Sequence, residues 1–339
     1  MSVRIFVPHL PAARATFIHP SVQEALARIG EVIYAKEGDV PWEAMPADID
    51  AIVVGWGGPA KLPKSVWSKL PKLKAIGVLG GSPAGIEESI EAVERGIAII
   101  SASHAIAEAV AEETIGLMLA ARYELVNNAC AFRTRGKLVV DGNHRNRSIA
   151  GSVVGVIGFG HTGQEMAKRL RAFGPDLRIY DPYVGDEVID QHGGQRISLD
   201  DLMRQSDIIT VHAGWTLQSE GMINASLLEL IRPGTLVVST ARMPLFDEKA
   251  LAAKVREGKF FFASDFVPFD ENIWSKEDIH SKQNLIGVPG HTSITERTIE
   301  QMGLLVARDL EAIFAGQKPK HRITADWIRH TTTRIPAKH

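Results

Sequence analysis

The strongest constraint on the fold is a glycine-rich turn. It follows an apolar run at residues 153–157 and precedes a helical pattern. Residues 158–163 read Gly-Phe-Gly-His-Thr-Gly, which matches G-x-G-x-x-G. A second apolar run, residues 177–180, follows the helical pattern and ends at Asp181. This order is typical of a dinucleotide-binding βαβ unit, in which a strand, a glycine turn, a helix and a second strand are followed by an acidic residue.

Each position of the turn has a predicted physical role. Gly158 permits the tight turn, Gly160 lets the backbone approach a pyrophosphate, and Gly163 lets the helix pack close to the strand. Phosphates are then expected to meet the backbone N–H groups at the positive end of the helix, where His161 and Thr162 lie.

The acid at the end of the second strand predicts which cofactor binds. A carboxylate at Asp181 can accept both ribose hydroxyls of an adenosine and repels a 2′-phosphate. Neither Pro182 nor Tyr183 offers a positive charge to such a phosphate. The sequence therefore predicts NAD as the cofactor, in preference to NADP.

The composition of the chain limits which partners it can bind and in which cellular compartment we expect it. The chain has 339 residues, enough for two domains, and its net charge of −2 favours neither nucleic acid nor an anionic membrane. No apolar run approaches transmembrane length, and the first residues do not resemble a signal peptide. Cys130 is the only cysteine, as expected in the cytoplasm, and no histidine pair has metal-ligand spacing, so we expect no metal.

Short apolar runs alternate with helical patterns along both halves of the chain. This alternation predicts an α/β protein with two Rossmann-like, doubly wound parallel-sheet lobes. The predicted strands, besides the two named above, are residues 3–7, 32–35, 51–55, 75–79, 97–101, 208–211, 235–239, 260–263 and 285–288. The predicted helices between strands are residues 22–29, 86–93, 199–205, 225–231 and 247–257.

Two longer helical patterns, residues 105–125 and 293–314, lie outside this alternation. We expect them to join the lobes, so that the first lobe is discontinuous. The expected domains are a substrate (catalytic) domain, residues 1–125 plus about 297–339, and an NAD-binding Rossmann domain, residues 126–296. The polar, basic stretch at 127–149 is expected to be a linker or an exposed arm.

The glycine turn is one of several stretches that together match a single family. The others are Leu73-Lys74-Ala75-Ile76, Glu94-Arg95-Gly96-Ile97, Val110-Ala111-Glu112, Tyr180-Asp181-Pro182, Ser206-Asp207-Ile208, Val211-His212, Arg232-Pro233-Gly234, Ser239-Thr240-Ala241-Arg242, Asp265-Phe266 and Asn284-Leu285. In order and approximate spacing, from about Leu73 to Ala315, they resemble the D-isomer-specific 2-hydroxyacid dehydrogenases. The resemblance implies NAD-linked reduction of a 2-oxo acid or the reverse oxidation. It also implies two lobes with the site in the cleft between them, and usually a homodimer.

The same resemblance implies further cofactor-binding residues. In the family the acid that corresponds to Asp265 faces the nicotinamide, although an acid at this position could also cap a turn. His212 ends a strand and is similar to a family residue near the cofactor. Thr240 and Ala241 belong to the matching Thr-Ala-Arg text and are expected to contact the cofactor as well.

Arg242 follows a predicted strand and occupies the position of the family's catalytic arginine. Its planar fork can bind a 2-oxo acid at both carboxylate and carbonyl, and can polarise the carbonyl for hydride attack. Met243 stands where the family usually has glycine, and a surface arginine after a strand is the alternative interpretation.

The acid–base pair departs from the family pattern. The family has a glutamate five residues after the aspartate, where this chain has Asp270, followed by Glu271. An ungapped alignment places Gly290 at the family's histidine, and a shift of one residue places His291 there. A histidine paired with a carboxylate supplies a proton near neutral pH, so we expect His291 to donate it, held by Asp270 or Glu271. The alternative is that His291 caps the next helix and the catalytic pair is lost.

The predicted substrate loop also departs from the family. Gly80, Gly81 and Ser82 follow a strand and offer backbone N–H groups to an anion. Pro83 removes one donor, so the identity of the acid stays open.

Two other functions compete with the dehydrogenase. One is an NAD-binding regulator or sensor that has lost the catalytic histidine. The other is formate-type dehydrogenation, whose product needs no proton donor.

Overall fold

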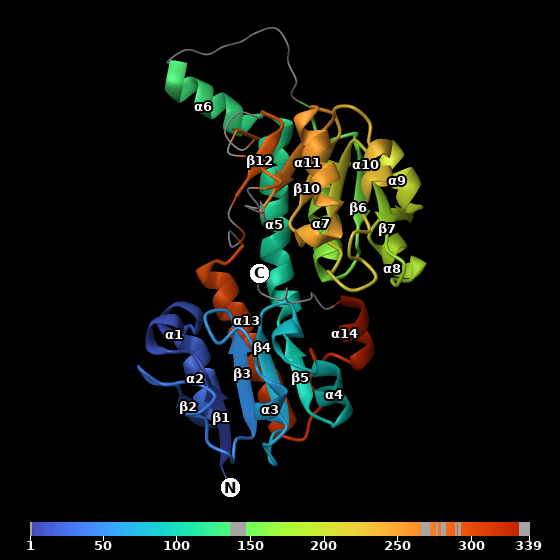
Figure 1. Cartoon of the computed structure of the whole chain (residues 1–339). Helices are drawn as coiled ribbons and strands as arrows, with labels where there is room; N and C mark the ends of the chain where they lie inside the picture. Colours follow the sequence, from blue (N-terminus) through green and yellow to red (C-terminus); the bar gives the residue numbers. More distant parts are fainter. Residues whose placement is uncertain are drawn as a thin grey trace. The chain divides into compact units, whose positions relative to one another are not determined.

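The computed structural model divides the chain into two compact units (Figure 1). It describes residues 2–135, 147–265, 272–275, 277–278, 283–288, 290 and 293–331. The first unit comprises Met1–Ala109 and Ile294–His339, and the second comprises Val110–Ser293. The division falls inside helix α5 (Ser103–Arg122), nearer to its start than the expected boundary at residue 125.

The first unit is built on a five-stranded parallel sheet in the order β2-β1-β3-β4-β5. Its strands are β1 (Val3–Val7), β2 (Gly30–Tyr34), β3 (Ala51–Gly55), β4 (Ala75–Leu79) and β5 (Ala98–Ser101). Its shorter helices are α1 (Pro11–Phe17), α2 (Pro20–Ile29), α3 (Lys64–Trp67), α4 (Ser89–Glu94) and α14 (Ala325–Thr331). Every residue of β4 is buried, which explains why this strand reads as a continuous apolar run.

Helix α13 (Glu296–Phe314) packs on this sheet beside α2 (Figure 1). Its side chain Val306 lies against β4 at Gly77, where an added Cβ would come within 2.3 Å of Val306 Cγ1. Thr295 caps the helix by accepting a hydrogen bond from the N–H of Thr298, so the helix begins later than residue 293. The late helix therefore contributes to the core of the first unit.

The second unit is built on a seven-stranded parallel sheet in the order β12-β11-β10-β9-β6-β7-β8. Its strands are β6 (Val153–Ile157), β7 (Asp176–Tyr180), β8 (Gly194–Arg196), β9 (Ile208–Val211), β10 (Leu236–Ser239), β11 (Phe261–Ser264) and β12 (Leu285–Gly287). The chain adds strands to one side of β6 and then to the other, so the direction of winding reverses between β6 and β9. The prediction of two doubly wound parallel sheets is confirmed.

Helices cover both faces of the second sheet. They are α7 (His161–Leu170), α8 (Asp186–Gln191), α9 (Leu199–Gln205), α10 (Ala225–Leu230) and α11 (Glu248–Arg256), together with α5. Along β10, Leu236 and Val238 join the core with α5 and α7, whereas Val237 joins the core with α9, α10 and α11. Strand residues therefore alternate between two buried faces, as a parallel sheet requires.

Three local expectations differ from the structure. Residues Leu125–Arg135 form a helix, α6, within the stretch expected to be a linker or arm. The helix expected at 86–93 begins only at Ser89, because Ile86 pairs with Leu62 in an isolated bridge. Strand β8 was not predicted, since it is short and its residues are largely exposed and polar.

Candidate active site

The glycine turn has the geometry that its sequence requires. Gly158 has a φ of 87°, and an added Cβ would come within 2.5 Å of the Ala213 backbone nitrogen. At Gly163 an added Cβ would come within 2.3 Å of the Gly158 carbonyl oxygen, so helix α7 packs directly on the turn. Nothing lies within 4 Å of the corresponding point at Gly160. The middle glycine therefore faces open space, which a pyrophosphate needs for close approach.

The start of α7 fits an anionic ligand. Gly160 is the N-cap residue, and no side chain accepts a hydrogen bond from the first turn at this position. His161 and Thr162 are the first helical residues and are half-buried. The backbone N–H groups at the start of a ten-residue helix, together with its dipole, favour a phosphate there.

Asp181 lies beside this turn, at the carboxyl end of β7, and is 8% exposed. Its Oδ2 accepts a hydrogen bond from the N–H of Phe159 at 2.7 Å, and its Oδ1 accepts from Tyr183 and Val184 at 2.8 and 3.0 Å. The guanidinium of Arg196 donates hydrogen bonds to the backbone carbonyl oxygens of Asp181 and Val184 in the same loop. The carboxylate therefore fixes the glycine turn and still has lone pairs for ribose hydroxyls.

We expect Asp181→Ala to narrow the preference for NAD over NADP. The native carboxylate repels a 2′-phosphate, and contact between like charges costs several kcal/mol, so NAD should be favoured by roughly 100-fold or more in kcat/KM. The alanine variant removes this repulsion, so its kcat/KM with NADP should rise relative to its kcat/KM with NAD, which falls because no carboxylate accepts the ribose hydroxyls. Asp181→Asn, which keeps one acceptor oxygen, is the matched control. Equal kcat/KM values for both cofactors in the native protein would contradict the prediction.

His212 follows β9, next to the turn. Its Nε2 lies 2.8 Å from Thr210 Oγ1, and its Nδ1 is buried with no hydrogen-bond partner among the described residues. Burial lowers the pKa of His212 to about 3. The ring is therefore neutral at physiological pH, so His212 cannot serve as a cationic proton donor.

Two predicted residues lie at the ends of the neighbouring strands β10 and β11. Ser239 of β10 pairs with Ser264 of β11, so Arg242 and Asp265 follow adjacent strand ends. Burial lowers the pKa of Arg242, while the charge of Asp265 acts in the opposite direction. Burial raises the pKa of Asp265 to about 6, while the charge of Arg242 opposes this shift. The opposite charges of the two side chains therefore act on each other at the carboxyl edge of the sheet.

A third charged group at this edge was missed in the sequence. Glu113 lies on α5, one residue before Thr114, whose Oγ1 is 3.0 Å from Thr240 Oγ1. Burial and the charge of Asp265 raise the pKa of Glu113 to about 7. Only its position within an apolar helical stretch, in the middle of α5, could have indicated it.

The remaining predicted site residues are those of the acid–base pair and of the substrate loop. Asp270, Glu271 and His291 lie outside the described residues. Gly80, Gly81 and Ser82 follow β4 in the first unit, where the N–H of Gly80 donates to the Val78 carbonyl at 3.0 Å. That bond leaves Gly80 without a free donor, so an anion there would depend on Gly81 and Ser82.

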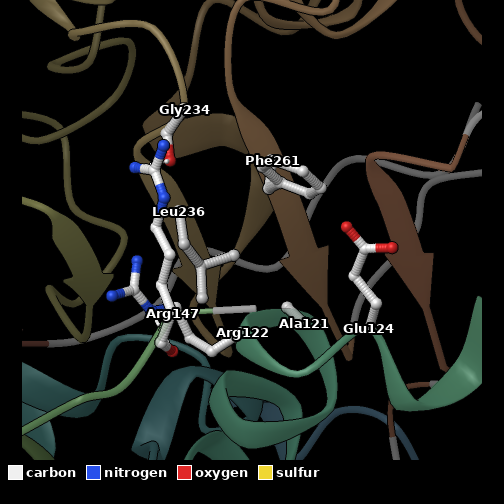
Figure 2. Close-up of a pocket in the computed structure, with 7 residues that line it drawn as sticks. All are labelled: Ala121, Arg122, Glu124, Arg147, Gly234, Leu236 and Phe261. Carbon is white, nitrogen blue, oxygen red and sulfur yellow. Dashed lines mark hydrogen bonds between the residues drawn. The ribbon is translucent and has the colours of Figure 1, made fainter. Parts of the chain in front are cut away.

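A pocket of the second unit lies away from this edge. Figure 2 shows the guanidinium groups of Arg122 and Arg147 on the side of Gly234, with the Glu124 carboxylate on the other side. Gly234 precedes β10, so this pocket lies at the amino ends of the strands, opposite to the glycine turn. It is therefore separate from the candidate active site.

The described part of the chain can be compared with what a metal site and a membrane-spanning helix require. Its His, Cys, Asp and Glu side chains form no group of three that could hold a metal ion. None of its helices is both long and apolar enough to cross a membrane.

A family model matches the part of the chain that carries this geometry. Residues 115–293 match the NAD-binding domain of the D-isomer-specific 2-hydroxyacid dehydrogenases. This chain belongs to that family. The family assignment from the sequence is thereby confirmed, and the matched segment is an NAD-binding domain.

Individual members of this dehydrogenase family are similar over most of the chain. A D-3-phosphoglycerate dehydrogenase of Methanocaldococcus jannaschii is 32% identical over 303 residues, which are 88% of this chain and 56% of the relative. A glyoxylate reductase of Thermococcus litoralis is 28% identical over 274 residues, 78% of this chain and 81% of the relative. The chain thus spans little more than half the length of the first relative.

A solved structure of a dehydrogenase shares the fold. The D-mandelate dehydrogenase of Rhodotorula graminis superposes with a TM-score of 0.82 at 20% identity, covering 95% of this chain and 98% of that one. At this identity the similarity concerns the fold alone.

Proposed function

We propose that this protein is an NAD-dependent oxidoreductase that transfers a hydride between NAD(H) and C2 of a 2-hydroxy or 2-oxo acid of the D-isomer type. The observation that carries the proposal is the placement of Arg242 beside Asp265, at adjacent strand ends of an NAD-binding domain. The names of the relatives, a D-3-phosphoglycerate dehydrogenase and a glyoxylate reductase, support this class of activity.

The residues of the second unit fit a bound dinucleotide. Gly160 and the start of α7 would hold the pyrophosphate, and Asp181 would accept the ribose hydroxyls. The other half of the cofactor would then lie over the ends of β9, β10 and β11, near His212, Thr240 and Asp265. When bound, the nicotinamide supplies or accepts the hydride.

The protein's own groups would prepare the substrate. The guanidinium of Arg242 would bind the carboxylate of the acid and polarise its carbonyl, which lowers the barrier to hydride attack. In our proposal His291 donates the proton to the new hydroxyl oxygen, and Asp270 or Glu271 holds the imidazolium. Neutral His212 is unsuited to that role because burial disfavours its protonated form.

A screen of NADH oxidation with a panel of 2-oxo acids tests the proposal. We expect turnover with at least one acid, and the panel should include glyoxylate and a phosphorylated 2-oxo acid. Inactivity with every acid, combined with tight NADH binding, would support the regulator instead, which the enzyme relatives do not favour. NAD reduction by formate, measured in parallel, tests the formate-type alternative.

We also propose that the protein is a cytoplasmic homodimer. Helix α6 and the turn before it expose large apolar side chains, which a partner copy would cover: Tyr123, Leu125, Val126 and Phe132. Light scattering should give twice the 37.0 kDa of one chain. Leu125→Glu with Phe132→Glu should produce monomers, whereas Leu217→Glu, at another exposed leucine, should not. A monomeric native protein would contradict this part of the proposal.

A further inference from the structure

The buried carboxyl of Glu113 has no role in the function described so far. Both of its carboxyl oxygens are buried and make no hydrogen bond of normal geometry with a described residue, although Ser293 lies close enough to act on the carboxyl. Oδ1 of Asp265 is also buried without a hydrogen-bond partner among the described residues. Buried polar atoms are usually paired, because an unpaired one costs free energy. Two carboxyls of this kind, one on α5 and one after β11, therefore call for a ligand or a function.

Their position points to the nicotinamide half of the cofactor. The adenosine end is assigned to Asp181 after β7 and the pyrophosphate to the turn after β6. In an open parallel sheet the rest of a dinucleotide continues over the strand ends beyond the switch point, here those of β9, β10 and β11. Thr114 contacts Thr240 at the end of β10, and Asp265 follows the adjacent end of β11. Glu113, next to Thr114, is therefore at the same edge.

Resting on the proposed function, we propose that Glu113 is a cofactor-positioning residue: its protonated carboxyl donates a hydrogen bond to the carboxamide oxygen of the nicotinamide, while the ionised carboxylate of Asp265 accepts from the carboxamide NH2. A carboxamide presents one acceptor oxygen and one NH2 donor. A pair of carboxyls with a single proton between them presents the complementary donor and acceptor. Two ionised carboxylates would have no donor for the carboxamide oxygen.

The charges around the pair assign the proton to Glu113. Arg242 stabilises the ionised form of Asp265, whereas no described cation acts on Glu113. The hydroxyl and backbone amide of Ser293 favour the ionised form of Glu113, but burial and the Asp265 charge outweigh them. The adjacent Glu112 is exposed, and its Oε1 lies 3.3 Å from Nη2 of Arg169. Glu112 therefore does not belong to the pair formed by Glu113 and Asp265. His212 after β9 is neutral.

This arrangement makes NADH binding depend on pH. The pKa of Glu113 is raised to about 7 and that of Asp265 to about 6, and the two carboxyls titrate as a coupled pair. Below about pH 6, Asp265 becomes protonated and can no longer accept the hydrogen bond. Above about pH 7, Glu113 ionises and can no longer donate one. NADH should therefore bind most tightly between about pH 6 and pH 7, and more weakly as the pH rises above 7.

Calorimetric titration of the full chain with NADH, and separately with ADP-ribose, between pH 6.5 and 9 tests the inference. ADP-ribose lacks the nicotinamide and reports on the rest of the site. The native Kd for NADH should rise about tenfold or more from pH 7 to pH 9, as the protonated fraction of Glu113 falls. The Kd for ADP-ribose should change by less than about threefold. Glu113→Gln, which donates at every pH, should bind NADH with a Kd nearly independent of pH.

Two further variants complete the test. Glu113→Leu should bind NADH roughly 3- to 10-fold more weakly than Glu113→Gln at pH 7, because it lacks the donor, and should bind ADP-ribose normally. Glu112→Gln, the matched control, should keep the native pH dependence. The inference is overturned if Glu113→Gln retains the alkaline loss of NADH binding, or if Glu113→Leu weakens ADP-ribose as much as NADH. If the native protein binds neither ligand, the proposed function itself fails, and this inference with it.

Discussion

Arg242→Ala is expected to lower kcat/KM for 2-oxo acid reduction by roughly 10³-fold, through both KM and kcat. The guanidinium is assigned to the substrate carboxylate and to the charge that develops on the carbonyl oxygen, so its removal weakens ground state and transition state together. The Kd for NADH at pH 7 should change by less than about threefold. Steady-state kinetics with the best acid of the panel measures the first effect, and calorimetry measures the second.

Arg242→Lys separates charge from shape. Lysine keeps the positive charge but lacks the planar fork, so we expect an intermediate loss of about 10- to 100-fold. Because the Arg242 charge holds down the pKa of Asp265, the alanine variant should also show that pKa moving above about 6. An alanine variant with native kcat/KM would remove Arg242 from the mechanism.

His291→Gln is the second large effect that we expect. If His291 donates the proton, kcat for 2-oxo acid reduction should fall by roughly 10²- to 10⁴-fold, while NADH binding stays nearly unchanged. Glutamine has a similar size and cannot supply a proton in the physiological range. Rapid-mixing or steady-state assays of NADH oxidation with the native protein and the variant measure the difference.

Asp270→Asn is the companion experiment. The negative charge near the imidazole favours its protonated form, so its removal should lower the apparent pKa of the histidine. Reduction needs the protonated ring, and activity should therefore begin to fall at a lower pH than in the native protein. If His291→Gln keeps full activity while Arg242→Ala loses it, the proton comes from another group, and the acid–base part of the proposal is wrong.

The parts of the fold that the sequence predicted are those with a local cause. The glycine turn needs a positive φ at Gly158 and close packing at Gly163, and glycine satisfies both requirements within one short stretch of sequence. Strands buried on both faces read as short apolar runs, so β4 and β9 were predicted with their observed bounds. The carboxyl ends of such strands meet at one edge of a parallel sheet, and Arg242 and Asp265, each assigned from the family resemblance, both follow strands that end at this edge.

The parts that the sequence did not predict depend on distant contacts or lack an apolar signal. Strand β8 has exposed polar residues and is recognisable only by its pairing with β7. Helix α6 exposes several of its apolar side chains, so no buried stripe marked it as a helix. Glu113 lies in the middle of α5, and its significance comes from Asp265, which follows a strand far along the chain.

Transfer of deuterium from cofactor to product tests the central claim most directly. The protein is incubated with NADH carrying deuterium at both C4 positions of the nicotinamide and with the acid that gives the fastest turnover, and the hydroxy acid is analysed by mass spectrometry and chiral chromatography. Our account predicts one deuterium at C2 and the D configuration. A product without deuterium at C2, a product of the L configuration, or no product from any acid despite tight NADH binding would contradict it.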